Sequence, residues 1–79
     1  MISKQFTNNP TLHAMVYEGE RLTITFKRSI GLQDRTYIGV PSNIAYALYY
    51  KQKAKDAISY FAKNIRKKFK VVSVNLKMR

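Results

Sequence analysis

Residues 21–27 read Arg-Leu-Thr-Ile-Thr-Phe-Lys, and this short stretch indicates the fold class of the chain. Leu22, Ile24 and Phe26 alternate with polar residues, so an extended segment here has one apolar face and one polar face. Such a pattern is typical of an antiparallel strand that lies against a core on one side and faces solvent on the other. It therefore predicts a strand over residues 21–27.

Two further strands are expected on either side of this one. Residues 12–17 are mostly apolar, and residues 18–20, Glu-Gly-Glu, have the composition of a tight turn. A polar loop over residues 28–34 separates the central strand from residues 35–40, which alternate again. We expect Ile38 of this third strand to face the core, which completes a three-stranded antiparallel meander.

The hydrophobic period changes at Pro41 from two residues to about 3.6, and this change predicts two helices. Ser42 is the expected N-cap of the first helix, which runs to about Ala54, and Asp56 is the expected N-cap of the second. The second helix has an apolar stripe that consists of Ile58, Phe61, Ala62, Ile65 and Phe69.

The two ends of the chain have different characters. Residues 1–11 are polar and aperiodic, so they are expected to form a loose arm or a short edge segment, whereas residues 71–76 predict a short C-terminal strand. The fold prediction is a single α+β domain over residues 1–79 with its core in residues 12–76, and both helices pack on one face of the sheet. The expected core consists of Leu22, Ile24, Phe26, Ile38, Leu48, Phe61 and Ile65.

The chain is strongly basic, with 15 Lys and Arg residues, 4 Asp and Glu residues and a formal net charge of +11. The charge is concentrated in residues 51–79, which contain ten basic residues and a single acidic one, Asp56. Such a surface is suited to an anionic partner. A membrane is not expected, because the longest apolar run, residues 44–50, is far shorter than the roughly 20 residues that span a bilayer.

Catalysis and metal binding are not expected either. The chain has one histidine, His13, and no cysteine, and its three glycines are isolated rather than arranged as a phosphate-binding loop. These features predict a protein that is not an enzyme and has no cofactor or metal. Residues 1–10 contain no apolar leader segment, which together with the absence of cysteine predicts a cytoplasmic location.

Aromatic residues are interleaved with the basic ones over residues 46–70, which contain Tyr46, Tyr49, Tyr50 and Tyr60. Phosphate groups require cations, and single strands also require flat rings on which bases can stack. We therefore expect a nucleic-acid-binding module, with RNA favoured over DNA, in which Tyr37 or Tyr60 stacks on bases. The alternative is a small regulator or phage-type effector that docks an acidic protein surface through the same basic residues. The cations expected to contact phosphates are Lys63, Arg66, Lys67 and Lys70.

Residues 16–69 resemble the KTSC domain, a small domain of bacterial and phage-like proteins that also occurs at the C-terminus of some lysyl-tRNA synthetases. The resemblance is carried by residues 16–17, 22–27, 37–41 and 60–66 and ends at Phe69, and Arg35 stands where the family has the first Tyr of a Tyr-x-Tyr motif. It implies the α+β fold and suggests RNA binding. Together with the charge pattern, it gives a candidate site formed by Arg35, Tyr37, Tyr60, Lys63, Asn64, Arg66, Lys67 and Lys70.

Overall fold

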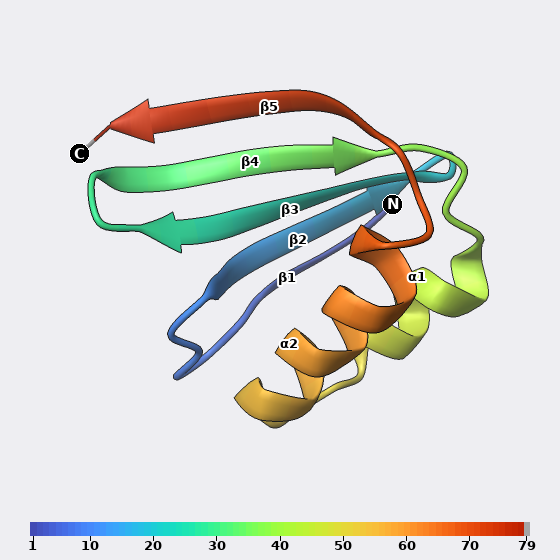
Figure 1. Cartoon of the computed structure of the whole chain (residues 1–79). Helices are drawn as coiled ribbons and strands as arrows, with labels where there is room; N and C mark the ends of the chain where they lie inside the picture. Colours follow the sequence, from blue (N-terminus) through green and yellow to red (C-terminus); the bar gives the residue numbers. More distant parts are fainter. Residues whose placement is uncertain (79) are drawn as a thin grey trace.

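Residues 1–78, which the computed structural model describes, contain five β-strands in one sheet, and all neighbouring strands are antiparallel (Figure 1). The strands follow one another across the sheet in chain order. The α+β class is therefore confirmed, with one strand more than the four predicted. The strands are β1 (Ile2–Gln5), β2 (Leu12–Glu18), β3 (Arg21–Arg28), β4 (Gly31–Tyr37) and β5 (Val71–Met78).

The additional strand is β1, which lies in the region predicted to be a loose arm or a short edge segment. It pairs with β2 from Ile2, opposite Tyr17, to Gln5, opposite Ala14. Residues 2–5 are therefore an edge strand and not a loose arm. Their backbone hydrogen bonds with β2 hold them in place, and their side chains alternate between half-buried and exposed, although only Ile2 is apolar.

The β3 strand has the two faces that its sequence predicts. Leu22, Ile24 and Phe26 are buried beneath the helices, while the threonines between them lie on the opposite face. On that face the Thr25 hydroxyl donates to Asp34 Oδ1 at 2.6 Å. The predicted turn before β3 is also present, because Gly19 has a φ of +57° and the next residue has a φ of +62°, as a two-residue type I′ hairpin requires.

The β4 strand differs from its prediction in position and in facing. It begins directly after a two-residue turn and ends at Tyr37, so residues 38–40 lie outside it. Pairing of Leu22 with Tyr37 and of Ile24 with Arg35 places Tyr37 and Arg35 on the helix side. Tyr37 is consequently 2% exposed, whereas Ile38, which was expected in the core, is 38% exposed.

Two helices connect β4 to β5 and pack on one face of the sheet, as predicted (Figure 1). They are α1 (Ser42–Tyr49) and α2 (Ala54–Phe61), and a π-helical segment, η1 (Ala62–Arg66), extends α2. The predicted caps are wrong: Pro41 and Lys53 occupy the N-cap positions without a side-chain cap hydrogen bond. Both N-cap residues have an extended backbone. Each helix therefore begins earlier than predicted from Ser42 and Asp56.

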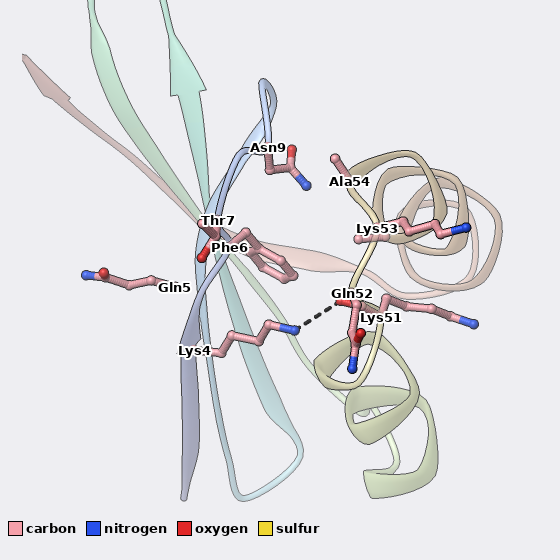
Figure 2. Close-up of a pocket in the computed structure, with 10 residues that line it drawn as sticks. Lys4, Gln5, Phe6, Thr7, Asn9, Lys51, Gln52, Lys53 and Ala54 are labelled. Carbon is pink, nitrogen blue, oxygen red and sulfur yellow. Dashed lines mark hydrogen bonds between the residues drawn. The ribbon is translucent and has the colours of Figure 1, made fainter.

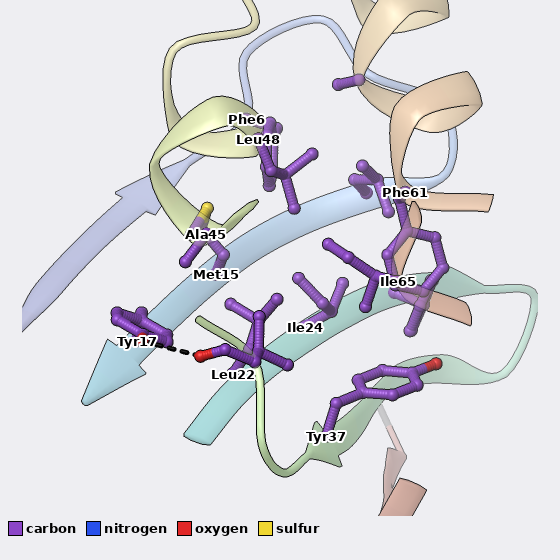
Figure 3. Packing of buried hydrophobic residues seen from close by; sticks show 14 residues of the cluster. Phe6, Met15, Tyr17, Leu22, Ile24, Tyr37, Ala45, Leu48, Phe61 and Ile65 are labelled. Carbon is purple, nitrogen blue, oxygen red and sulfur yellow. Dashed lines mark hydrogen bonds between the residues drawn. The ribbon is translucent and has the colours of Figure 1, made fainter. Parts of the chain in front are cut away.

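The core lies between the helices and the sheet (Figure 3). Phe61 and Ile65 point from the second helical segment toward the strands, and the Phe61 ring meets the Phe26 ring edge-on with centroids 5.3 Å apart. The Tyr17 hydroxyl donates to the Val40 carbonyl at 2.7 Å and thereby ties β2 to the segment before α1. Of the predicted core residues, Leu22, Ile24, Phe26, Leu48, Phe61 and Ile65 belong to this cluster.

Candidate nucleic-acid interface

The predicted cations of the second helix lie on its solvent side. Lys63 and Arg66 belong to η1, and Lys67 follows it directly; all three are exposed, while Ile65 of the same segment is fully buried. The helix ends earlier than predicted, at Arg66, so Lys70 lies in the connection to β5 and not on the helix. The Lys70 carbonyl accepts a hydrogen bond from the Ile38 backbone N–H at 3.3 Å.

Tyr60 and Asn64 lie on the same helical segment and are partly buried. The Asn64 side-chain amide donates to the Tyr60 carbonyl at 3.2 Å, so this amide is engaged with its own helix. The Lys51 ammonium lies 5.2 Å from the centre of the Tyr60 ring and covers one of its faces. Burial raises the pKa of the Tyr60 phenol above its ordinary value.

Tyr37 is not part of this surface, because its ring is buried; of the two rings predicted to stack on bases, only Tyr60 lies here. The Tyr37 ring lies against Phe61 in the core, with centroids 5.7 Å apart (Figure 3). The exposed rings are instead at the C-terminal end of α1, where Tyr50 is 70% exposed and its ring stacks on that of Tyr46. Lys51 connects these rings to Tyr60. It follows Tyr50 directly in the sequence, and its ammonium group lies over the Tyr60 ring.

Arg35 and Arg66, which lie far apart in the sequence, meet at one small cavity together with Arg28. The cavity has a volume of about 130 Å³, and its other walls include Phe26 and Phe61. We call it the arginine recess. Arg28 was missed by the sequence analysis, because residues 28–34 were assigned to a polar loop instead of the end of β3 and most of β4.

A neutral side chain, Gln33, holds two of these arginines. Its Oε1 atom accepts hydrogen bonds from Nε and Nη2 of Arg28 at 3.2 and 3.1 Å and from Nε of Arg35 at 3.1 Å. The same two guanidinium groups lie 5.0 and 5.4 Å from the centre of the Phe26 ring. Because the shared acceptor is an amide and not a carboxylate, it orients the arginines without neutralising them.

A second cavity, of about 210 Å³, lies between β1 and the connection from α1 to α2 (Figure 2). Three lysines line it, but the Lys4 ammonium donates to the Lys51 carbonyl at 3.0 Å and to the Tyr49 carbonyl. The Lys51 and Lys53 ammonium groups point away from the cavity. The Lys4 ammonium is therefore engaged with backbone carbonyls at the end of α1. Fewer positive charges are available to a ligand in this cavity than in the arginine recess.

Other kinds of site have little support in the described part of the chain. Within residues 1–78, no three His, Cys, Asp or Glu side chains are grouped closely enough to hold a metal ion. Neither helix of that range has the length and apolar character needed to cross a bilayer. No protein-family model matches the chain, and searches of the curated proteins and of the solved structures find no matching protein.

Proposed function

We propose that this protein binds single-stranded nucleic acid along the outer surface of its helices, from the arginine recess to Tyr50. The observation that carries the proposal is the convergence of Arg28, Arg35 and Arg66 on one recess, near the exposed Lys63 of η1 and Lys67, which follows it. The recess and the lysines supply charge for phosphates, and the 70% exposed Tyr50 supplies a ring for a base.

The preference for RNA over DNA rests on the resemblance to the KTSC domain, and we propose membership of that family on the same grounds. Of the residues that match family positions, Tyr60, Asn64 and Arg66 lie on the proposed surface, whereas Tyr37 serves the core. The match at Tyr37 thus supports the fold, and the matches at Tyr60, Asn64 and Arg66 support the proposed binding surface.

A salt titration tests the proposal. Binding of fluorescein-labelled twelve-nucleotide RNA, DNA and duplex is measured by anisotropy between 50 and 200 mM salt. If four cations each neutralise one phosphate of a single strand, the slope of log K against log salt is about −3, because each contact contributes about −0.7. Absence of salt-dependent binding to every one of these probes would refute the proposal.

Variants that remove positive charge locate the surface. Replacing Lys63 and Lys67 together with Gln is expected to flatten the slope by about 1 to 1.5 units and to weaken all sequences alike. Arg21→Gln is the control, because Arg21 is exposed at the opposite end of β3 from Arg28. It should leave the slope within about 0.3 units of the wild-type value, since Arg21 contacts no phosphate in this proposal.

A second candidate function is docking of an extended protein segment, and one feature favours it. Among residues 1–78 the sheet ends at β5, whose outer edge pairs with no other strand. Val72, Val74 and Leu76 of this strand are exposed, and an extended segment can add to such an edge through backbone hydrogen bonds. A protein partner would saturate at a defined stoichiometry and would compete with neither RNA nor DNA at the helix surface.

A further inference from the structure

The arginine recess is the most specific feature of the proposed surface. We propose that it binds a phosphate monoester, the terminal phosphate of a nucleic-acid strand, and this inference rests on the proposed function. The neighbouring lysines lie on an open surface, whereas the three arginines line a cavity of about 130 Å³ between α2, η1 and the sheet.

The hydrogen-bonding capacity of the recess fits a phosphate group. Each guanidinium carries N–H donors in a planar fork that matches phosphate oxygens. Among the hydrogen bonds of residues 1–78, Arg35 uses Nε on Gln33 and Arg28 uses Nε and Nη2, so terminal nitrogens of both remain for a ligand. Gln33 and the Phe26 ring hold the two forks in place before a ligand arrives, which lowers the entropy that binding must remove.

The electrostatics of the recess fit a doubly charged anion. Within the described chain, the residues that line the cavity include three arginines and no Asp or Glu. The nearest acidic residue in the sequence, Asp34, lies on the opposite face of the sheet, where it accepts the Thr25 hydroxyl. A terminal phosphate carries a charge of about −1.5 to −2 at neutral pH, whereas an internal phosphodiester carries −1.

The shape of the recess also favours a strand end over an internal phosphate. Phe26 forms its floor on the sheet side, and Ile58 and Phe61 of α2 form a wall. A terminal phosphate has three free oxygens, one for each guanidinium, and its chain leaves in one direction only. An internal phosphodiester has two free oxygens and a chain on both sides, which a cavity bounded by a sheet and a helix accommodates poorly.

An apolar strip next to the recess can receive the nucleotide that carries the phosphate. Val74 pairs with Arg35 and Leu76 pairs with Gln33 across β4 and β5, so these side chains share the helix side of the sheet. Val74 is 51% exposed, because the helices do not cover this part of the sheet. A sugar or base attached to the bound phosphate would therefore meet an apolar surface instead of water.

The test compares one twelve-nucleotide RNA with a 5′-phosphate, with a 3′-phosphate and with hydroxyl groups at both ends, at 100 mM salt. We expect at least one phosphorylated form to bind ten times more tightly than the hydroxyl form, and inorganic phosphate to shift the side-chain Nε resonances of Arg28 and Arg35. Arg66→Gln should reduce the preference to less than threefold, and Arg21→Gln should retain it. Arg66 is exposed, so its replacement should leave the fold intact; Arg35→Gln is the second variant.

The outcomes separate this inference from the proposed function. Equal, salt-dependent binding of all three RNAs would overturn the inference and leave the proposed function standing. Retention of the full preference in both Arg66→Gln and Arg35→Gln would overturn the assignment of the phosphate to this recess. If no RNA bound but inorganic phosphate shifted the arginine resonances, the proposed function would fail and the recess would remain a site for a small phosphate monoester.

Discussion

Replacing Gln33 with Glu should make the protein more stable and weaken its binding of phosphate. Gln33 Oε1 accepts from both Arg28 and Arg35, so a carboxylate at this position would form charge-assisted bonds with two guanidinium groups. The pairs are partly exposed, and exposed ion pairs contribute about 0 to 1 kcal/mol each. We therefore expect the free energy of unfolding to rise by about 0.5 to 1.5 kcal/mol.

The same substitution lowers the charge of the recess. One of its three positive charges is neutralised, so we expect the slope of log K against log salt to flatten by about 0.7 units. The preference for a phosphorylated strand end should fall below threefold. The arginine N–H groups would bind the introduced carboxylate in place of the neutral Gln33 amide, and they would therefore be less available to a phosphate ligand.

Thermal unfolding followed by circular dichroism measures the first effect, and for a chain of this size 1 kcal/mol corresponds to a rise in Tm of about 4 to 8 °C. Two arginines would lower the pKa of the introduced carboxyl group, so the added stability should be present above about pH 4.3 and disappear as the pH falls below it. Gln5→Glu, an exposed position in β1, controls for the general benefit of a negative charge on a protein of net charge +11. A lower Tm for Gln33→Glu than for this control, or an unchanged preference for phosphorylated ends, would refute the reasoning.

Three further predictions concern the core and the aromatic surface. Ile65→Ala should cost about 2 to 5 kcal/mol in denaturant unfolding, because Ile65 is fully buried; a cost below about 1 kcal/mol would contradict the packing. Tyr17→Phe should cost about 1 to 3 kcal/mol, since it leaves the buried Val40 carbonyl without its donor. Burial raises the pKa of the Tyr17 phenol, so stability should fall as the pH rises above about 10, and less steeply in this variant. Tyr50→Ala should weaken single-strand binding by about 1 to 3 kcal/mol with little effect on duplex binding, and equal losses for both would exclude stacking.

The parts of the fold that could be predicted from the sequence are those in which the core determines the residue pattern. β3 alternates because one face is fully buried, and Phe61 and Ile65 recur at helical spacing because their stripe covers that face. The exposure of Lys63 follows from the same stripe, since charged residues occupy the side opposite the core, whereas Arg66 flanks the stripe and lines the recess. The helix caps could not be predicted in this way, because backbone geometry at Pro41 and Lys53, not a polar side chain, starts each helix.

The error in β4 arises from the residues that form the candidate site. The helix-side positions of this strand are Gly31, Gln33, Arg35 and Tyr37, so the face that should read as apolar is polar over its first half. A rule that seeks alternating apolar residues therefore places the strand further along, where Ile38 and Val40 restore the pattern, and turns Tyr37 toward solvent.

The structural reason for that polar face is the extent of the helix layer. The helices cover the end of β4 that contains Tyr37, where the ring meets Phe61, but they leave Val74 exposed beside Arg35. Apolar residues at positions 33 and 35 would gain little burial there, whereas a Gln that orients two arginines builds a cationic recess. The departure of β4 from the expected pattern therefore coincides with the residues that line the recess, which is where the proposed function would be expected to override local sequence rules.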